Sequence, residues 1–385
     1  MIYLDNSATT FPKPDSVSAE VYKAMKYYCA NPGRSGHKLS LLAASKVFEC
    51  RSAVCKLFNI DDENKVIFTS GCTASLNMVI KGVLESGDHC VISSLEHNSV
   101  LRPLQKLKSK NITYSVAQVY PEDDEKTLNS FRNCINEKTK LFVCTHASNV
   151  FGIRLPIERL CALAHSYGVM FCVDAAQSAG VLDVNVGEYG YDFVCCAGHK
   201  GLYGPMGTGV LVVNSDYNLS TLIEGGTGSE SSNFNQPDFY PDKFESGTLN
   251  VAGICGLKKG IDFVISKNHD KIHRYEINLL KKLYISLSKN RKIILHTSLP
   301  SVEYFAPVLS FSVRDTDSEK VASFMNNNYS ICVRAGLHCA PLAHKYMNTE
   351  KYGTIRISPS VFTTEKHIDA LIHAVNNFNF YKELS

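Results

Sequence analysis

Two ionisable residues stand where buried strands of this chain would end. Asp174 closes the apolar run "VMFCVD", and Lys200 follows the next such run, in "YDFVCCAGHK". A buried carboxylate needs a cationic partner to offset the cost of its burial, and apolar surroundings disfavour a charged lysine. A Schiff-base lysine and an aspartate that pairs with a pyridinium nitrogen are the groups that bind pyridoxal phosphate in its enzymes. The alternative for Lys200 is a surface turn from which the side chain reaches water.

The stretch "TSGCTAS" is suited to the phosphate group of such a cofactor. Gly71, Cys72 and Thr73 follow the apolar run "KVIF" and open a helical pattern. Free N–H groups at a helix N-terminus, with a hydroxyl beside them, form a site for an anion such as phosphate. Taken alone, an ordinary helix cap by Ser70 or Thr73 is the simpler interpretation.

Other polar residues follow apolar runs in the same way. His97 comes after "CVISSL" and a glutamate, Asn149 after "KLFVCTHAS", and Gln177 closes "DAAQ". Each residue, taken alone, could have an ordinary structural role in its loop. A single ligand site explains all of them together, whereas the structural interpretation requires a separate explanation for each. Five glycines accompany Lys200, at positions Gly198, Gly201, Gly204, Gly207 and Gly209. Because glycine has no Cβ, we expect them to let the cofactor come close to the backbone.

The elements that must position these residues alternate along the chain. Between positions 65 and 214, short apolar runs are separated by helical patterns. This alternation predicts an α/β fold, in which helices flank a mostly parallel sheet. Ligands of such sheets bind beyond the carboxyl ends of the strands, where the polar residues stand.

A long helical pattern from Val251 to Lys289, with a break near Asn268, follows this region. Beyond it, strand-like and helical stretches alternate and predict a smaller α+β domain. We place the large domain at 15–265 and the small domain at 266–385, with the segment 1–14 packing on the small one.

Composition excludes several classes of protein. The chain has 385 residues, of which 44% are hydrophobic and 20% charged, and its net charge is +3. A small net charge with both signs interspersed gives no reason to expect nucleic-acid binding. The start "MIYLDNSATT" lacks the features of a signal peptide, and no run approaches the roughly 18 apolar residues of a membrane span. We therefore expect a cytoplasmic protein that binds neither nucleic acid nor membrane.

The 14 cysteines are scattered, many inside apolar runs, as small hydrophobic residues are. No C-x-x-C pair supports a zinc ribbon or a thioredoxin-like site, and a disulfide framework is not expected in a large chain without an export signal. The stretch "HCAPLAH" brings His338, Cys339 and His344 together, but its spacing fits no common structural zinc pattern. We expect no metal site.

A series of motifs in fixed order gives the chain a resemblance to a known family. The motifs are "YLDNSATT", "NPGRSGHKLS", "TSGCTASLN", "EHNS", "SNVFG", "VDAAQS", "GHKGLYGPMGTGVL", "FESGTLN" and "RAGLHCAP". With them the chain resembles the class V aminotransferase-like, fold-type I pyridoxal-phosphate enzymes, and within these the cysteine desulfurases. The resemblance covers nearly the whole chain, and the ordered set is far more specific than any single motif.

The resemblance implies a role for each residue noted above. Lys200 would bond covalently to pyridoxal 5'-phosphate, Asp174 would pair with its ring nitrogen, and His97 would stack on the ring and move protons. The other implied cofactor contacts are Gln177 and Asn149 at the phenolic oxygen, and Cys72, Thr73, His199 and Thr248 around the phosphate. Thr248 would reach the site of a second subunit, so the resemblance implies a homodimer, with Arg34 near its interface.

The resemblance also implies the reaction. Cys339, with Arg334 and His338 nearby to favour its thiolate, would take sulfur from L-cysteine as a persulfide, leaving L-alanine and passing the sulfur to a protein acceptor. Arg356 of "GTIRIS", with Asn149, would bind the substrate carboxylate, a task suited to the fork of an arginine.

Other functions fit the same residues. The alternatives are a selenocysteine lyase, a pyridoxal-phosphate-dependent C–S lyase or aminotransferase that does not use Cys339, and an inactive binding subunit. No motif indicates whether the sulfur goes to iron–sulfur cluster assembly, to transfer-RNA thiolation or elsewhere.

Ala197 and Leu337 depart from the usual pattern of the family, as does the stretch "SGTLN", which stands where some relatives have "GTPN". Ala197 stands where relatives commonly carry serine or threonine, which predicts the loss of one phosphate hydrogen bond, about 0.5–1.5 kcal/mol unless water replaces it. Leu337 stands where many relatives have histidine. None of these changes removes a group to which we give a catalytic role.

Overall fold

The apolar runs of the first two-thirds of the chain form one central sheet. In the computed structural model, which describes residues 1–33 and 36–378, this sheet has seven strands in the order β2-β8-β7-β6-β5-β3-β4. The strands are β2 (Val66–Thr69), β3 (His89–Ser93), β4 (Thr113–Ala117), β5 (Thr139–Thr145), β6 (Met170–Asp174), β7 (Phe193–Ala197) and β8 (Gly209–Val213). Strands β4, β3, β5, β6 and β7 are parallel, whereas β8 and β2 pair antiparallel at one edge. The predicted α/β fold with a mostly parallel sheet is confirmed.

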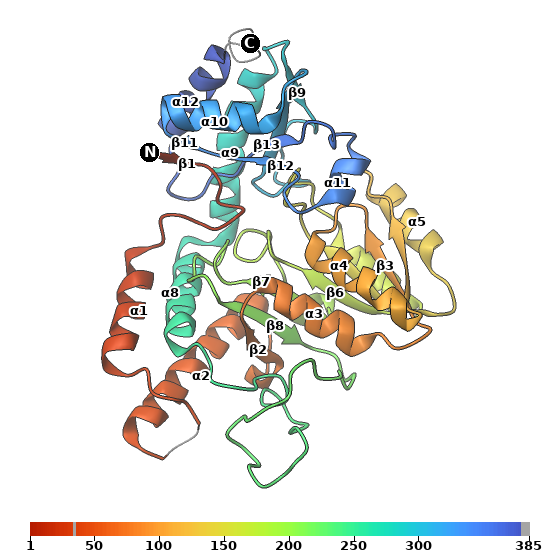
Figure 1. Ribbon diagram of the computed structural model, residues 1–385, viewed down its shortest axis with the longest axis vertical. Helices are drawn as coiled ribbons and strands as arrows, with labels where there is room; N and C mark the ends of the chain where they lie inside the picture. The colour runs from red at the N-terminus through yellow and green to blue at the C-terminus, as the bar shows by residue number, and fades with distance from the viewer. Residues whose placement is uncertain (34–35, 379–385) are drawn as a thin grey trace.

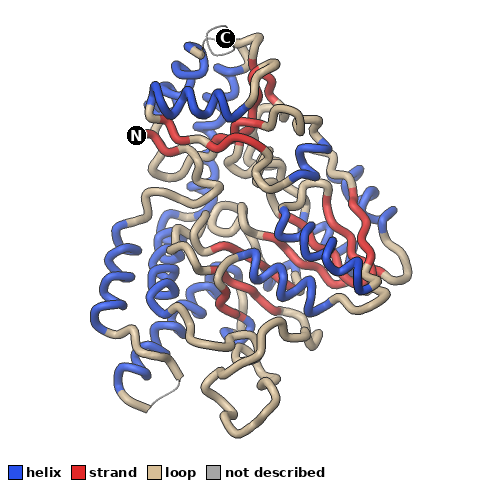
Figure 2. Tube along the Cα trace, viewed as in Figure 1, coloured by secondary structure: helices blue, strands red, loops and turns tan. Residues whose placement is uncertain are grey.

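Helices cover both faces of this sheet (Figure 2). They are α1 (Asp15–Tyr27), α2 (Lys38–Phe58), α3 (Cys72–Val83), α4 (Asn98–Leu107), α5 (Asp124–Cys134), α6 (Ile157–Ser166), α7 (Val186–Tyr189) and α8 (Val251–Lys267), with short 3₁₀ turns at Glu63–Lys65 and Lys108–Lys110. One face packs against α2, α5, α6 and α8, and the other against α3 and α4. Every residue of β3, β7 and β8 is buried, because both faces of these strands are covered.

The last third of the chain forms a second layered unit above the central sheet (Figure 1). Its elements are α9 (His269–Leu287), β9 (Ile293–Leu295), β10 (Leu309–Val313), α10 (Ser318–Tyr329), β11 (Ile331–Cys332), β12 (Arg334–Gly336), α11 (Pro341–Tyr346), β13 (Thr354–Ile357) and α12 (Glu365–Asn377). An antiparallel sheet in the order β12-β13-β10-β9 packs on α9, α10 and α12 around a separate hydrophobic core. The start of the chain joins this unit, because β1 (Ile2–Tyr3) pairs parallel with β11.

The predicted break near Asn268 is confirmed. Asn268 ends α8 with a φ of 68°, and its side chain caps α9 by accepting hydrogen bonds from the N–H groups of Asp270 and Lys271. A short polar side chain tolerates this left-handed backbone and supplies the cap at once. No helix in the described part of the chain has both the length and the apolar character needed to cross a membrane.

Candidate active site

The carboxyl ends of the central strands open into a cavity of about 250 Å³. Its walls are Ser70, Gly71, Cys72, Thr73, Ala74, His97, Ser99, Thr145, Asn149, Asp174, Ala176, Gln177, Ala197, His199 and Lys200. These side chains come from the N-terminus of α3, the start of α4 and the segments that follow β5, β6 and β7. The cavity therefore brings together every predicted cofactor-binding residue except Thr248.

Lys200 and Asp174 line this cavity from neighbouring strand ends. Asp174 is the last residue of β6 and is 3% exposed, while Lys200 is half-buried in the loop after β7. Burial lowers the pKa of Lys200, and the negative charge of Asp174 opposes that effect. Asp174 forms no ion pair within the described residues, 1–33 and 36–378. A buried carboxylate in that state suits a cationic ligand.

The N-terminus of α3 is available to an anion. Its N-cap is Gly71, which has no side chain, so the alternative of an ordinary cap by Ser70 or Thr73 is wrong. The hydroxyl of Thr73 instead lies 2.7 Å from that of Ser99, at the cavity wall. The N–H groups of Cys72 and Thr73, the first two of the helix, donate no hydrogen bond to the described residues, so they can bind a phosphate.

His199 adds a buried nitrogen without a partner to the same cavity. Its Nδ1 atom makes no hydrogen bond to the described residues. Burial, together with the nearby charges of Lys200 and Lys13, lowers the pKa of His199 to about 4. A neutral imidazole carries one donor and one acceptor nitrogen, so His199 can hydrogen-bond a ligand in this cavity.

The glycines near Lys200 do not line the cavity as predicted. A Cβ on Gly201 would lie 2.4 Å from the carbonyl oxygen of Ala179, and one on Gly209 would lie 2.4 Å from the Cα of Gly71. These positions require glycine because other parts of the chain pack against their backbone. For these two glycines the interpretation that they admit the cofactor is wrong, although Gly209 serves the site indirectly by letting the start of α3 approach β8.

His97 is held at the start of α4 as its N-cap. Its Nδ1 atom accepts a hydrogen bond from the backbone N–H of Ser99 at 3.1 Å, so the neutral ring carries its proton on Nε2. Burial lowers the pKa of His97, and the charge of Asp174 partly offsets this. The ring is therefore neutral near pH 7.

Glu96 precedes His97 and is fully buried. Its Oε1 atom accepts hydrogen bonds from the Ser93 hydroxyl at 2.5 Å and the Thr145 N–H at 2.8 Å, while Oε2 has no partner among the described residues. Burial raises the pKa of Glu96 to about 8. Glu96 is thus a neutral acid that joins the ends of β3 and β5, a role that its sequence position did not predict.

Arg356 lies on β13, behind Asn149. Its side chain is 1% exposed, and its Nη1 donates to the carbonyl oxygen of Asn149 at 3.0 Å. Its Nη2 is paired with the carboxylate of Asp5 at 2.5 Å. Arg356, which we predicted to bind the substrate carboxylate, therefore already has an anionic partner. A substrate carboxylate would share the guanidinium with Asp5.

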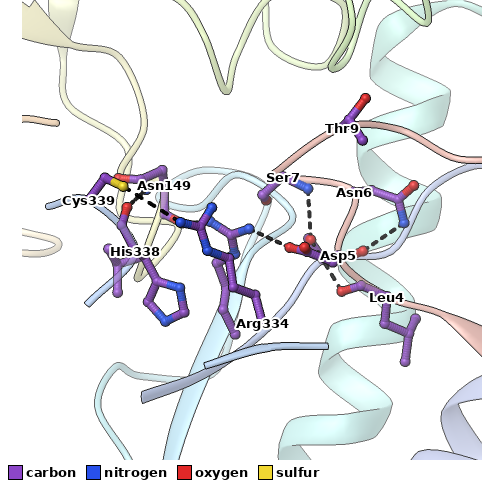
Figure 3. A network of polar contacts seen from close by, with 12 residues as sticks. Leu4, Asp5, Asn6, Ser7, Thr9, Asn149, Arg334, His338 and Cys339 are labelled. Atoms are coloured by element: carbon purple, nitrogen blue, oxygen red, sulfur yellow. Dashed lines mark hydrogen bonds and ion pairs between the residues drawn. The ribbon is translucent and has the colours of Figure 1, made fainter. Parts of the chain in front are cut away.

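Cys339 lies exposed in the loop between β12 and α11. Its Sγ atom is 3.6 Å from Nη2 of Arg334 (Figure 3). His338 and Cys339 have φ values of 48° and 59°, a conformation that costs free energy in residues other than glycine. Such strain persists only where the surroundings fix it.

Three hydrogen bonds fix the Cys339 loop. The His338 ring bonds the carbonyl oxygen of Thr354 at 3.0 Å, and the His338 carbonyl accepts from the Asn149 side chain at 2.8 Å. The Cys339 carbonyl accepts from the N–H of Asn98 at 2.8 Å. Because Asn98 follows His97 and Asn149 lines the cavity, the loop is attached directly to the cavity wall.

The remaining predicted residues lie elsewhere. Thr248 is exposed and lines a different hollow, together with Ser70, Ala74 and Gly209. Arg34 falls outside the described residues.

Comparison with known proteins agrees with this geometry. The aminotransferase class-V family model matches residues 2–371. The chain belongs to the class-V aminotransferase family. Within this family, probable cysteine desulfurases of Methanothermobacter thermautotrophicus and Pyrococcus abyssi are 31% and 32% identical to it, over 96% and 97% of this chain and 92% of each relative.

Solved structures of the family share the fold. A cysteine desulfurase from Thermococcus onnurineus, solved in its apo form, matches with a TM-score of 0.88 and 30% identity, covering 97% of this chain and 93% of that one. The cysteine desulfurase CsdA from Escherichia coli matches with a TM-score of 0.86 and 25% identity, covering 99% and 94%. The predicted family and its fold type are thereby confirmed.

Several residues of the site escaped the sequence patterns. Ser99 and Thr145 line the cavity, and Asp5 pairs with Arg356. The motif "YLDNSATT" contains Asp5, but nothing in it indicates a partner on β13. A parallel bridge between Asp5 and Ser358, two residues after Arg356, brings these distant segments together.

Proposed function

We propose that this protein is a pyridoxal-phosphate-dependent cysteine desulfurase. It would convert L-cysteine to L-alanine and carry the sulfur on Cys339 as a persulfide for a protein acceptor. One observation supports this most strongly: the exposed Cys339 loop is hydrogen-bonded to Asn149 and Asn98, at the wall of the cavity that holds Lys200 and Asp174. The curated relatives carry the same activity in their names.

The cavity residues fit pyridoxal phosphate. Lys200 would be the amine for covalent attachment, Asp174 is a buried carboxylate without an ion-pair partner among the described residues, and the first two N–H groups of α3 have no acceptor there. The unpartnered Nδ1 of His199 adds a polar contact. When bound, the cofactor supplies an electron sink that stabilises negative charge on the substrate.

The chain's own residues then have separate tasks. Asp174 would favour a protonated ring nitrogen by its charge, and Lys200, whose pKa is lowered by burial, would accept a proton from the substrate Cα. His97 carries a transferable proton on Nε2. Arg356 and Asn149 would orient the substrate carboxylate.

Cys339 receives the sulfur. Its thiolate forms an S–S bond with the substrate sulfur as the substrate Cβ–S bond breaks, and Cβ takes up a proton to become the methyl group of alanine. The net change is one cysteine and one thiol converted to alanine and a persulfide, so no external oxidant or reductant is needed. The Arg334 Nη2 atom lies 3.6 Å from this sulfur and is placed to donate a hydrogen bond to it.

The test is a product analysis with a matched control. Purified protein loaded with pyridoxal phosphate should release alanine from L-cysteine, and mass spectrometry should find one added sulfur on the Cys339 peptide. Cys339→Ala should bind the cofactor normally yet lose persulfide formation by orders of magnitude. Cys29→Ala, which removes another exposed cysteine, should behave as wild type. A Cys339→Ala variant that turns over L-cysteine at the wild-type rate would instead indicate a lyase.

We also propose that the protein works as a homodimer in the cytoplasm. Thr248 would complete the phosphate site of the partner, which accords with its exposed position outside the cavity of its own chain.

A further inference from the structure

Cys72 lies against Asp174 inside the cavity. Cys72 opens α3 and Asp174 closes β6, so residues far apart in sequence meet at the strand ends. The Cys72 Sγ atom is 3.3 Å from Asp174 Oδ1 and 3.4 Å from the carbonyl oxygen of Cys195. Because a hydrogen bond to an ionised acceptor is stronger, the thiol proton is directed mainly to the carboxylate.

The thiol of Cys72 remains protonated at neutral pH. The side chain is 8% exposed. Burial, and after it the charge of Asp174, raises the pKa of Cys72 well above its usual value. Cys72 therefore acts here as a hydrogen-bond donor and not as a nucleophile.

The two donors to Asp174 both act on one oxygen. Oδ1 accepts from Cys72 and, at 2.9 Å, from the backbone N–H of Ala176. Oδ2 accepts no hydrogen bond from the described residues. Rotation of a carboxylate about its last side-chain bond is soft, so two donors on one oxygen fix the direction of the other.

We propose that Cys72 is a positioning residue, which orients the Asp174 carboxylate so that Oδ2 is presented to the ring nitrogen of the cofactor. This role differs from the direct contact with the phosphate expected for Cys72. The role toward the cofactor rests on the proposed function, whereas the contact between thiol and carboxylate does not.

The contact is tested first without cofactor. The full chain, with no pyridoxal phosphate added, is treated with iodoacetamide at several pH values, and alkylation of each cysteine is followed by peptide mass spectrometry. Asp174→Asn removes the neighbouring negative charge, so the pKa of Cys72 should fall and its alkylation should become about tenfold faster for each unit of that fall. Cys339 should react equally fast in both proteins and serves as the internal control. Equal rates at Cys72 in both proteins would overturn the contact.

The positioning role is tested with cofactor. The affinity for pyridoxal phosphate and the pH dependence of the bound cofactor's absorbance are compared among Cys72→Ala, Cys72→Ser and wild type. Cys72→Ala should bind about tenfold more weakly and shift the absorbance transition, whereas Cys72→Ser keeps a donor and should restore both. Cys90→Ala removes a buried thiol that has no contact with Asp174 and controls for packing.

The two experiments separate the possible failures. If Cys72→Ala and Cys72→Ser bind and titrate alike, the positioning role is refuted. If wild-type protein binds no pyridoxal phosphate, the proposed function fails, and with it the role toward the cofactor. The alkylation rates then still decide whether the thiol donates to Asp174.

Discussion

Arg356 and Asp5 form a nearly buried ion pair, 2.5 Å apart, between β13 and the segment that follows β1. The pair links the N-terminal segment to the C-terminal unit, which also contains Cys339. It also fixes the guanidinium behind Asn149, through the bond from Nη1 to the Asn149 carbonyl. In the proposed function, the same guanidinium would also bind the substrate carboxylate.

Asp5→Ala should destabilise the protein. It leaves the Arg356 guanidinium buried without its carboxylate, which costs about 3 kcal/mol in comparable pairs. Asp5→Asn should cost less, because its amide oxygen still accepts the hydrogen bond. Urea unfolding gives the free energies, and unfolding of Asp5→Ala at the wild-type urea concentration would contradict the prediction.

Glu96 should make stability depend on pH. Its pKa is raised to about 8 in the folded protein, whereas an unfolded glutamate titrates near 4.3. The folded form therefore holds the proton more tightly, and the contribution of Glu96 to stability, complete at low pH, is lost as pH rises toward about 8.

Glu96→Gln tests this dependence because its amide keeps the acceptor and cannot ionise. Its stability relative to wild type should increase between about pH 5 and pH 8, by up to about 1.4 kcal/mol per pH unit. The measurement is chemical unfolding across this range, with the exposed Glu137→Gln as control. A constant difference across the range would show that Glu96 is already ionised in the folded protein.

Lys200 should account for the colour of the protein. Loaded with pyridoxal phosphate, wild type should be yellow, and Lys200→Ala should lose this absorbance together with turnover, because in the proposed function the lysine amine forms the covalent attachment. Lys366→Ala, at an exposed site, should change neither. A wild-type protein that stays colourless with added cofactor would refute the cofactor proposal.

Thr248 should affect cofactor binding only in the dimer, through the site of the partner subunit. Thr248→Val removes a hydroxyl that, in the proposed dimer, binds the phosphate, and it should weaken cofactor binding roughly threefold to tenfold. Thr113→Val, on the exposed edge strand β4, is the control. Sedimentation should show a dimer, and a fully active monomer would rule out the shared site.

The sequence determined most of the large sheet and much of the site. Strands β3, β5, β6 and β7 were predicted because continuous apolar runs are what burial on both faces requires. The ends of these apolar runs also placed Asp174 and Lys200 at the carboxyl ends of strands, where ligands bind in sheets of this kind. The domain boundary between 265 and 266 and the site roles remain predictions.

The tertiary structure decided which distant segments meet, because the hydrophobic pattern along the chain carries no information about contact partners. Strand β4 was not predicted, because it lies half-exposed at the sheet edge and lacks an apolar run. The partners Asp5–Arg356 and Cys72–Asp174 join segments far apart in sequence, and a pattern along the chain shows which face a residue occupies but not what it meets there. For the same reason Gly201 and Gly209 were assigned to the cofactor, until the fold placed other backbone segments against them.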